Sequence, residues 1–129
     1  MNNYINWLER AKGNLILAGI KIKKGVFYED LCFQAQQAVE KGLKALLLFY
    51  DVEPAHTHNL VILLQELAKC TKVPATIKNA VILNNYAVQT RYPGDYVPVK
   101  YKEYKKILQL AKDIIKWIEY KIVTEPRLY

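Results

Sequence analysis

The sequence predicts an all-α fold, an antiparallel up-and-down bundle of about five helices. Its 129 residues are enough for one hydrophobic core but not for two. Glycine and proline are scarce, with five of each, which favours long regular elements over the many turns of a β-sandwich. Apolar residues recur mainly every three, four or seven positions, which is the spacing of one helical face. We therefore expect residues 1–124 to form a single domain and residues 125–129 to form a loose tail.

The first two helices are predicted over residues 4–24 and 28–51. Gly25 ends the first helix, and Glu29 and Asp30 complement the dipole at the start of the second. The apolar residues of the first helix share one stripe: Ile5, Leu8, Leu15, Ala18 and Ile22. The second has an apolar face opposite a polar one at i, i+4 spacing, so it is the clearest helix in the chain.

Three further helices are predicted over residues 57–70, 72–91 and 100–122. Thr57 follows the breaker segment VEPAHTH and is a candidate cap for the third helix. A Pro-Gly pair stops the fourth helix, so Arg91 lies in its last turn. The fifth helix has a continuous apolar stripe and a face rich in lysine.

The chain carries a formal net charge of +7. Its lysines gather in GIKIKKG and in VKYKEYKKILQLAKDIIKW. Such a surface suits nucleic acid, a nucleotide or an acidic protein partner. It is equally typical of a solvated lysine face that keeps a helical protein soluble.

The cysteines, the N-terminus and the apolar runs indicate a cellular location. Cys32 and Cys70 form no CxxC pair, which argues against a zinc site or a disulfide framework and fits a reducing compartment. The N-terminus lacks the order of a signal peptide, and no apolar run reaches the length of a membrane span. We expect a cytoplasmic protein with no membrane association, no metal and no cofactor.

Strict alternation of five helices would bring the polar residues most useful for chemistry to one end of the bundle. That end would collect Phe49, Tyr50, His56, Thr57, His58, Arg91, Tyr92, Asp95 and Lys100. The sequence therefore suggests an anion-binding site, in which the Arg91 guanidinium and the amides after Thr57 hold a phosphate or carboxylate. Its candidate ligand-binding residues are Arg91, Tyr92, Thr57, His58 and Lys100. In the alternative, Arg91 pairs structurally with Asp95 or interacts with the end of its helix.

Two other groups of polar residues have simpler interpretations. His56 and His58 are two possible metal ligands without a third, so a capping role and a packing role are favoured over a metal site. A general-base role for His58 stays open as an alternative, but the sequence gives it no support, because no partner is evident at a fixed spacing. Gln37, Glu40 and Lys41 are interpreted as a hydrogen-bonded seam between helices.

Tyrosines and lysines are mixed around the start of the fifth helix. The residues are Tyr92, Tyr96, Tyr101 and Tyr104, with Lys100, Lys102 and Lys105. Aromatic and basic side chains in this mixture stack on bases and hold phosphates. Tyrosine and arginine are also favoured anchors of a dimer interface, so both interpretations stay open.

The stretch CFQAQQAVEKGLKALLLFYDVEPAHTHNLVILLQEL, residues 32–67, together with YAVQTRYPGDY, resembles the HEPN family, the higher eukaryotes and prokaryotes nucleotide-binding domain. The likeness covers nearly the whole chain and includes the closing LAKDIIKWI. It implies an all-α bundle, a homodimer and a neighbouring minimal nucleotidyltransferase in a toxin–antitoxin-like pair.

Many members of this family are metal-independent RNases with an Arg-x4–6-His motif. From Arg91 that spacing reaches Tyr96, Val97 and Pro98, and no histidine follows His58. The resemblance is thus to an Arg-Tyr-Pro-Asp branch, here with Gly94 inserted before the aspartate. A non-catalytic role is favoured.

Three functional hypotheses remain. The first is a nucleotide- or RNA-associated binding module that works with a nucleotidyltransferase. The second is a metal-independent RNase with a variant site made of Arg91, Asp95, Tyr96 and His58. The third is a non-catalytic adaptor that uses the same end of the bundle as a protein interface.

Overall fold

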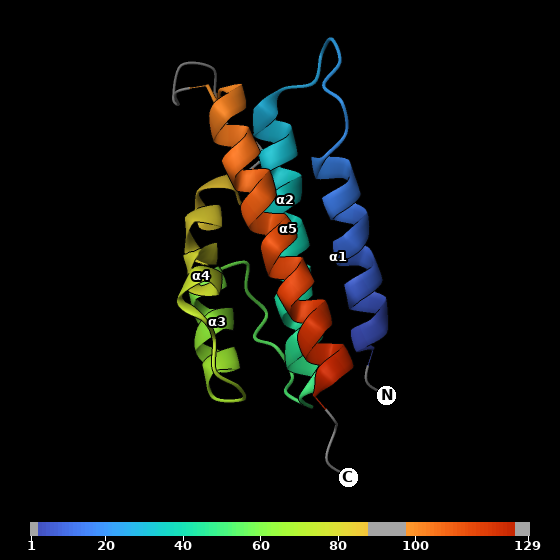
Figure 1. Ribbon diagram of the computed structural model, residues 1–129, viewed down its shortest axis with the longest axis vertical. Helices are drawn as coiled ribbons and strands as arrows, with labels where there is room; N and C mark the ends of the chain where they lie inside the picture. The colour runs from blue at the N-terminus through green and yellow to red at the C-terminus, as the bar shows by residue number, and fades with distance from the viewer. Residues whose placement is uncertain (1–2, 88–97, 126–129) are drawn as a thin grey trace.

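Helix α2 (Tyr28–Phe49) is the centre of the bundle. The computed structural model describes residues 3–87 and 98–125, and these contain helices and no strand, so the predicted all-α bundle is confirmed (Figure 1). The other elements are α1 (Tyr4–Ala18), α3 (Leu60–Ala68), α4 (Ala75–Lys78), the 3-10 helix η1 (Asn79–Tyr86) and α5 (Tyr101–Thr124). Helix α2 packs against α1, α3, η1 and α5, which explains why its apolar pattern is the clearest in the sequence. No described helix has the length and hydropathy that a membrane span requires.

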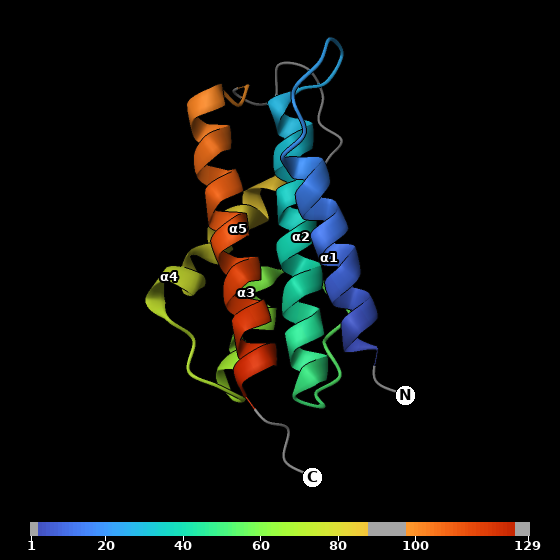
Figure 2. The same ribbon diagram turned by 45° about the vertical axis from the view of Figure 1, so that its right-hand side comes forward.

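Helices α1 and α2 are antiparallel, but α5 runs in the same direction as α2 (Figures 1 and 2). At one end, Tyr28 of α2 stacks on Tyr104 of α5, with 5.0 Å between the ring centroids. At the other end, the Tyr50 hydroxyl donates to the carboxylate of Glu125. The two helices are parallel because the chain turns back alongside α2 before α3 begins.

This arrangement corrects the prediction that one end of the bundle collects the polar residues. Phe49 and Tyr50 lie at the end of α2, whereas Lys100 precedes α5 at the opposite end. His58 contacts Glu40, which lies nine residues, or about 14 Å of helix, before Phe49. Arg91, Tyr92, Asp95 and Tyr96 lie outside the described residues.

Several helix ends also differ from the prediction. Helix α1 ends at Ala18 instead of near residue 24, and α3 begins at Leu60 because Asn59, not Thr57, is its cap. The predicted fourth helix is divided into one turn of α4 and the 3-10 helix η1. This segment is rich in asparagine, valine and isoleucine, which have low helix propensity, so packing determines its geometry.

The predicted loose tail begins at Glu125, but the structure ties this residue down. Its carboxylate accepts hydrogen bonds from Tyr50 and from Lys121. Residues 126–129 lie outside the described part of the chain.

Candidate functional site

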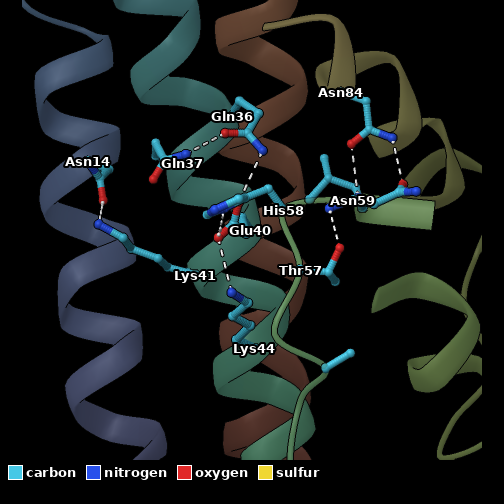
Figure 3. A network of polar contacts seen from close by, with 12 residues as sticks. Asn14, Gln36, Gln37, Glu40, Lys41, Lys44, Thr57, His58, Asn59 and Asn84 are labelled. Atoms are coloured by element: carbon cyan, nitrogen blue, oxygen red, sulfur yellow. Dashed lines mark hydrogen bonds and ion pairs between the residues drawn. The ribbon is translucent and has the colours of Figure 1, made fainter. Parts of the chain in front are cut away.

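A buried carboxylate is the centre of the polar network in this protein (Figure 3). Glu40 lies on α2 and is 3% exposed. It accepts hydrogen bonds from Gln36 Nε2 at 3.3 Å and from Lys44 Nζ at 3.1 Å. His58 Nδ1 lies 3.0 and 3.1 Å from its two oxygens. Because a carboxylate only accepts, Nδ1 carries the hydrogen in this contact, and Nε2 remains for another partner.

One more hydrogen bond extends this network along α2, and a separate set of polar contacts joins α2 to α1. Gln37 donates to Gln36 at 2.7 Å, and Lys41 Nζ donates to Asn14 Oδ1 of α1 at 2.8 Å. Asn14 also donates to Gln34 at 2.7 Å. The predicted hydrogen-bonded seam between helices is confirmed only for Lys41, because Gln37 and Glu40 bond within α2 and, for Glu40, to His58 of the following connection.

A hollow of about 360 Å³ lies beside this network. Trp7 of α1 and Lys44 and Leu48 of α2 form one part of its wall. The remainder of the wall is the connection of residues 53–58. The Lys44 ammonium lies 5.6 Å from the centroid of the Trp7 ring, so the lysine is held between an aromatic ring and the Glu40 carboxylate.

The chain between α2 and α3 is held in place by hydrogen bonds that its backbone amides donate. Asp51 adopts a positive φ of 61°, which reverses the chain after α2, and Val52 N donates to Leu47 O at 2.9 Å. Ala55 N then donates to Glu66 of α3 at 3.1 Å. These contacts place His56, Thr57 and His58 against the side of α2 instead of beyond its end.

The start of α3 is not the open set of amides that the sequence suggested. Asn59 N donates to Thr57 Oγ1 at 3.0 Å, and Val61 N donates to Asn59 Oδ1 at 3.0 Å. Leu60 N donates to Asn84 Oδ1 at 2.9 Å. Protein oxygens thus occupy these donors, and the prediction that they bind a phosphate is wrong for all three.

The structure brings together only part of the predicted site. Thr57 and His58, together with His56, line the hollow. Lys100 lies beside the start of α2, where the amide of the neighbouring Val99 donates to Glu29. The prediction that Lys100 lies close to Thr57 and His58 is therefore wrong. Arg91 and Tyr92 lie outside the described residues. Among the described residues, no cluster of three or more acidic, cysteine or histidine side chains is suited to a metal ion.

Tyr104 belongs to the core and not to a surface that stacks on bases. It is 6% exposed, and its hydroxyl donates to the Ala18 carbonyl at 2.6 Å. Burial is the main cause that raises the pKa of this hydroxyl. Tyr101 is 57% exposed, and Lys105 Nζ lies 5.9 Å from its ring centroid. Among the described tyrosines of the predicted aromatic and basic surface, Tyr101 is therefore the one that is exposed beside a lysine.

Sequence reasoning missed two members of the site, Trp7 and Lys44. The i, i+4 spacing of Glu40 and Lys44 was a usable signal, because residues at this spacing share one helical face. Trp7 gave no such signal, because its position depends on how α1 packs against α2.

Comparisons with known proteins agree with this architecture. A family model described as the HEPN domain matches residues 4–121. A solved structure of a protein from Thermus thermophilus is 34% identical, with a TM-score of 0.80, and the match covers 94% of this chain and 99% of that one. The structure of an archaeal HEPN homologue is 30% identical, with a TM-score of 0.72, over 95% of this chain and 99% of that one. The comparison with curated proteins gave no significant match.

Proposed function

Because the chain belongs to the HEPN domain family, we propose that it is a nucleotide- or RNA-associated binding module whose ligand lies in the hollow beside Trp7. In this proposal the module acts as a homodimer with a minimal nucleotidyltransferase, as in a toxin–antitoxin pair. The partner and the dimer follow from the family resemblance. The ligand site is argued from the described residues.

The observation that carries the proposal is the chemical character of the hollow. Its volume of about 360 Å³ falls in the range of small-molecule sites, which runs from about 300 to 1,000 Å³. The partly buried Trp7 indole offers a flat apolar surface to a base. The polar side chains around it are four with hydrogen-bond donors, Lys44, Thr57 and the two histidines, and one carboxylate, Glu53.

Lys44 is well placed to contact a phosphate. Its ammonium has three hydrogens, of which one is used by Glu40, and its side chain is held on α2 and over Trp7. The His58 side chain is 78% exposed, while its Nδ1 is fixed by Glu40. These groups thus present positioned donors without a rearrangement of the helices, which lowers the entropic cost of binding.

The test is a calorimetric titration of the purified protein with adenosine monophosphate. Trp7→Leu removes the aromatic surface but keeps an apolar side chain, so we expect binding to weaken by about tenfold, the effect of losing one base stack. Trp117→Leu is the matched control, because this partly buried tryptophan of α5 does not line the hollow. Equal losses in the two variants, or no binding by the unaltered protein, would contradict the proposal.

One observation favours a second candidate, the metal-independent RNase. Glu40 orients His58 and leaves Nε2 toward solvent, as a carboxylate does for the histidine base of a catalytic triad. In this alternative His58 accepts the proton of an RNA 2′-hydroxyl. Cleavage of RNA in the presence of a chelator, lost in His58→Asn, would support it, and intact RNA after incubation with the unaltered protein would exclude it.

A further inference from the structure

Trp7 separates two hollows, and only one of them belongs to the site described above. The second has a volume of about 320 Å³ and is lined by Asn3, Asn6, Trp7, Arg10 and Lys41. The tryptophan lines both hollows, so they are neighbours on the surface where α1 packs against α2.

The second hollow has the chemistry of an anion site. Its two charged lining residues, Arg10 and Lys41, are both cationic. Arg10 is exposed and has no ion-pair partner among the described residues, so its guanidinium is available for two parallel hydrogen bonds to a phosphate. Lys41 is held by Asn14 at 2.8 Å and keeps two further donor hydrogens.

The cations that line the two hollows are evenly spaced along their helices. Arg10 follows Trp7 by three residues on α1, and Lys41 precedes Lys44 by three residues on α2. Each step is about one helical turn, or roughly 5 Å along the axis. One aromatic ring thus has a cation of α2 on the side of the first hollow and two cations on the side of the second.

We propose that the two hollows are consecutive subsites for single-stranded RNA, with a base against Trp7, one phosphate near Lys44 and the next phosphate held by Arg10 and Lys41. This inference rests on the proposed function and specifies its ligand. A mononucleotide reaches only the first hollow, whereas an oligonucleotide also contacts the second. A duplex binds more weakly, because its bases are stacked on one another and cannot reach an aromatic side chain.

The experiment compares the affinities of adenosine monophosphate, a single-stranded adenosine hexanucleotide and a 12-base-pair RNA duplex for the full chain. We expect the hexanucleotide to bind at least about tenfold more tightly than the mononucleotide and the duplex, because it adds a phosphate contact and a stacked base. Arg10→Ala should lower hexanucleotide affinity by about tenfold, and at least five times more than it lowers mononucleotide affinity.

Lys116→Ala is the matched control. It removes one positive charge from an exposed position of α5 that lines neither hollow, so it reports the general effect of charge on RNA binding. Equal losses of hexanucleotide affinity in Arg10→Ala and Lys116→Ala would overturn the second subsite. Mononucleotide binding without a gain for the hexanucleotide would overturn this inference alone. Absence of binding by every ligand would overturn the proposed function with it.

Discussion

At the scale of single residues, Glu40 determines how the site is organised. A carboxylate that is 3% exposed is costly to bury unless several donors surround it, and Gln36, Lys44 and His58 supply them. The sequence predicted that Glu40 takes part in a hydrogen-bonded network on the polar face of α2, because the spacing of that face is helical. It did not predict the contact with His58, because that contact depends on the path of a loop 18 positions further along the chain.

Two ion pairs of similar length allow the effect of burial to be measured. The pair of Lys44 and Glu40, at 3.1 Å, has side chains that are 12% and 4% exposed. The pair of Lys12 and Glu119, at 3.2 Å, has side chains that are 52% and 40% exposed. Lys44→Met should lower the free energy of unfolding by about 3 kcal/mol, since it leaves a buried charge without its cation.

Lys12→Met should change the free energy of unfolding by less than about 0.5 kcal/mol, because water already screens that pair. Urea unfolding of both variants measures the difference. Similar losses in the two variants would show that Glu40 does not depend on Lys44 for its burial.

At the scale of elements, Gly42 decides how closely α2 approaches α5. A Cβ at this position would lie 2.7 Å from Ile115 Cδ1 and 3.0 Å from Ile118 Cδ1. Both isoleucines are buried, so their ends cannot move freely. Gly13 of α1 is exposed, and a Cβ added there would have nothing within 4 Å, so it is a matched glycine without the steric constraint.

Opposite effects are expected when each glycine is replaced by alanine. Gly13→Ala should stabilise the protein by about 0.5–1 kcal/mol through helix propensity. Gly42→Ala should destabilise it by about 1–2 kcal/mol, because overpacking exceeds the same gain in propensity. Thermal unfolding followed by circular dichroism measures both changes, and stabilisation by Gly42→Ala would contradict the tight packing of α2 against α5.

The elements also show where sequence patterns were sufficient. Helices α2 and α5 were predicted within two residues at each end, because each has a long apolar face that is buried over most of its length. The segment of α4 and η1 was predicted as one regular helix, but its pattern is short and its propensity is weak. Packing against α2, α3 and α5 therefore decides the geometry of this segment.

At the scale of the whole molecule, the least predictable property was the direction of the helices. Short connections suggested strict alternation, but residues 50–59 run back along α2, so α3 begins near its middle. Nothing in the local sequence specifies this path. As a result, the prediction that Thr57 and His58 share a site with Lys100 was wrong: the first two line the hollow beside α2, and Lys100 lies at the start of α5.

The hydrogen bond from Tyr50, which follows α2, to Glu125, which follows α5, makes the stability of the protein depend on pH. Burial, and then the hydrogen bond with Glu125, raise the pKa of Tyr50 from 10.0 to about 12. The contribution of Tyr50 to the free energy of unfolding is therefore fully present below pH 10.0 and is lost as the pH rises through about 12. Burial acts to raise the pKa of Glu125, but hydrogen bonds from Lys121 and Tyr50 outweigh it and lower the pKa. That contribution is present above pH 4.5 and is lost as the pH falls further.

Tyr50→Phe should lower the free energy of unfolding by about 1 kcal/mol at pH 7, and by less at both extremes of pH, because it removes one hydrogen bond to a charged group. Tyr120→Phe is the control, since that side chain is 62% exposed. Burial also raises the pKa of Cys32 to about 12, but this contribution is the same in both variants and cancels in the comparison. Urea unfolding between pH 3 and pH 11 tests this, and a constant difference at every pH would contradict it.

The central position of α2 has a consequence for how the protein opens. Because α1, α3, η1 and α5 all pack on this one helix, loss of any one of them leaves the other three in contact with α2. Loss of α2 removes the common support of all four. Partial unfolding should therefore proceed from the periphery inward, and the amide hydrogens of α2 should be the last to exchange with solvent.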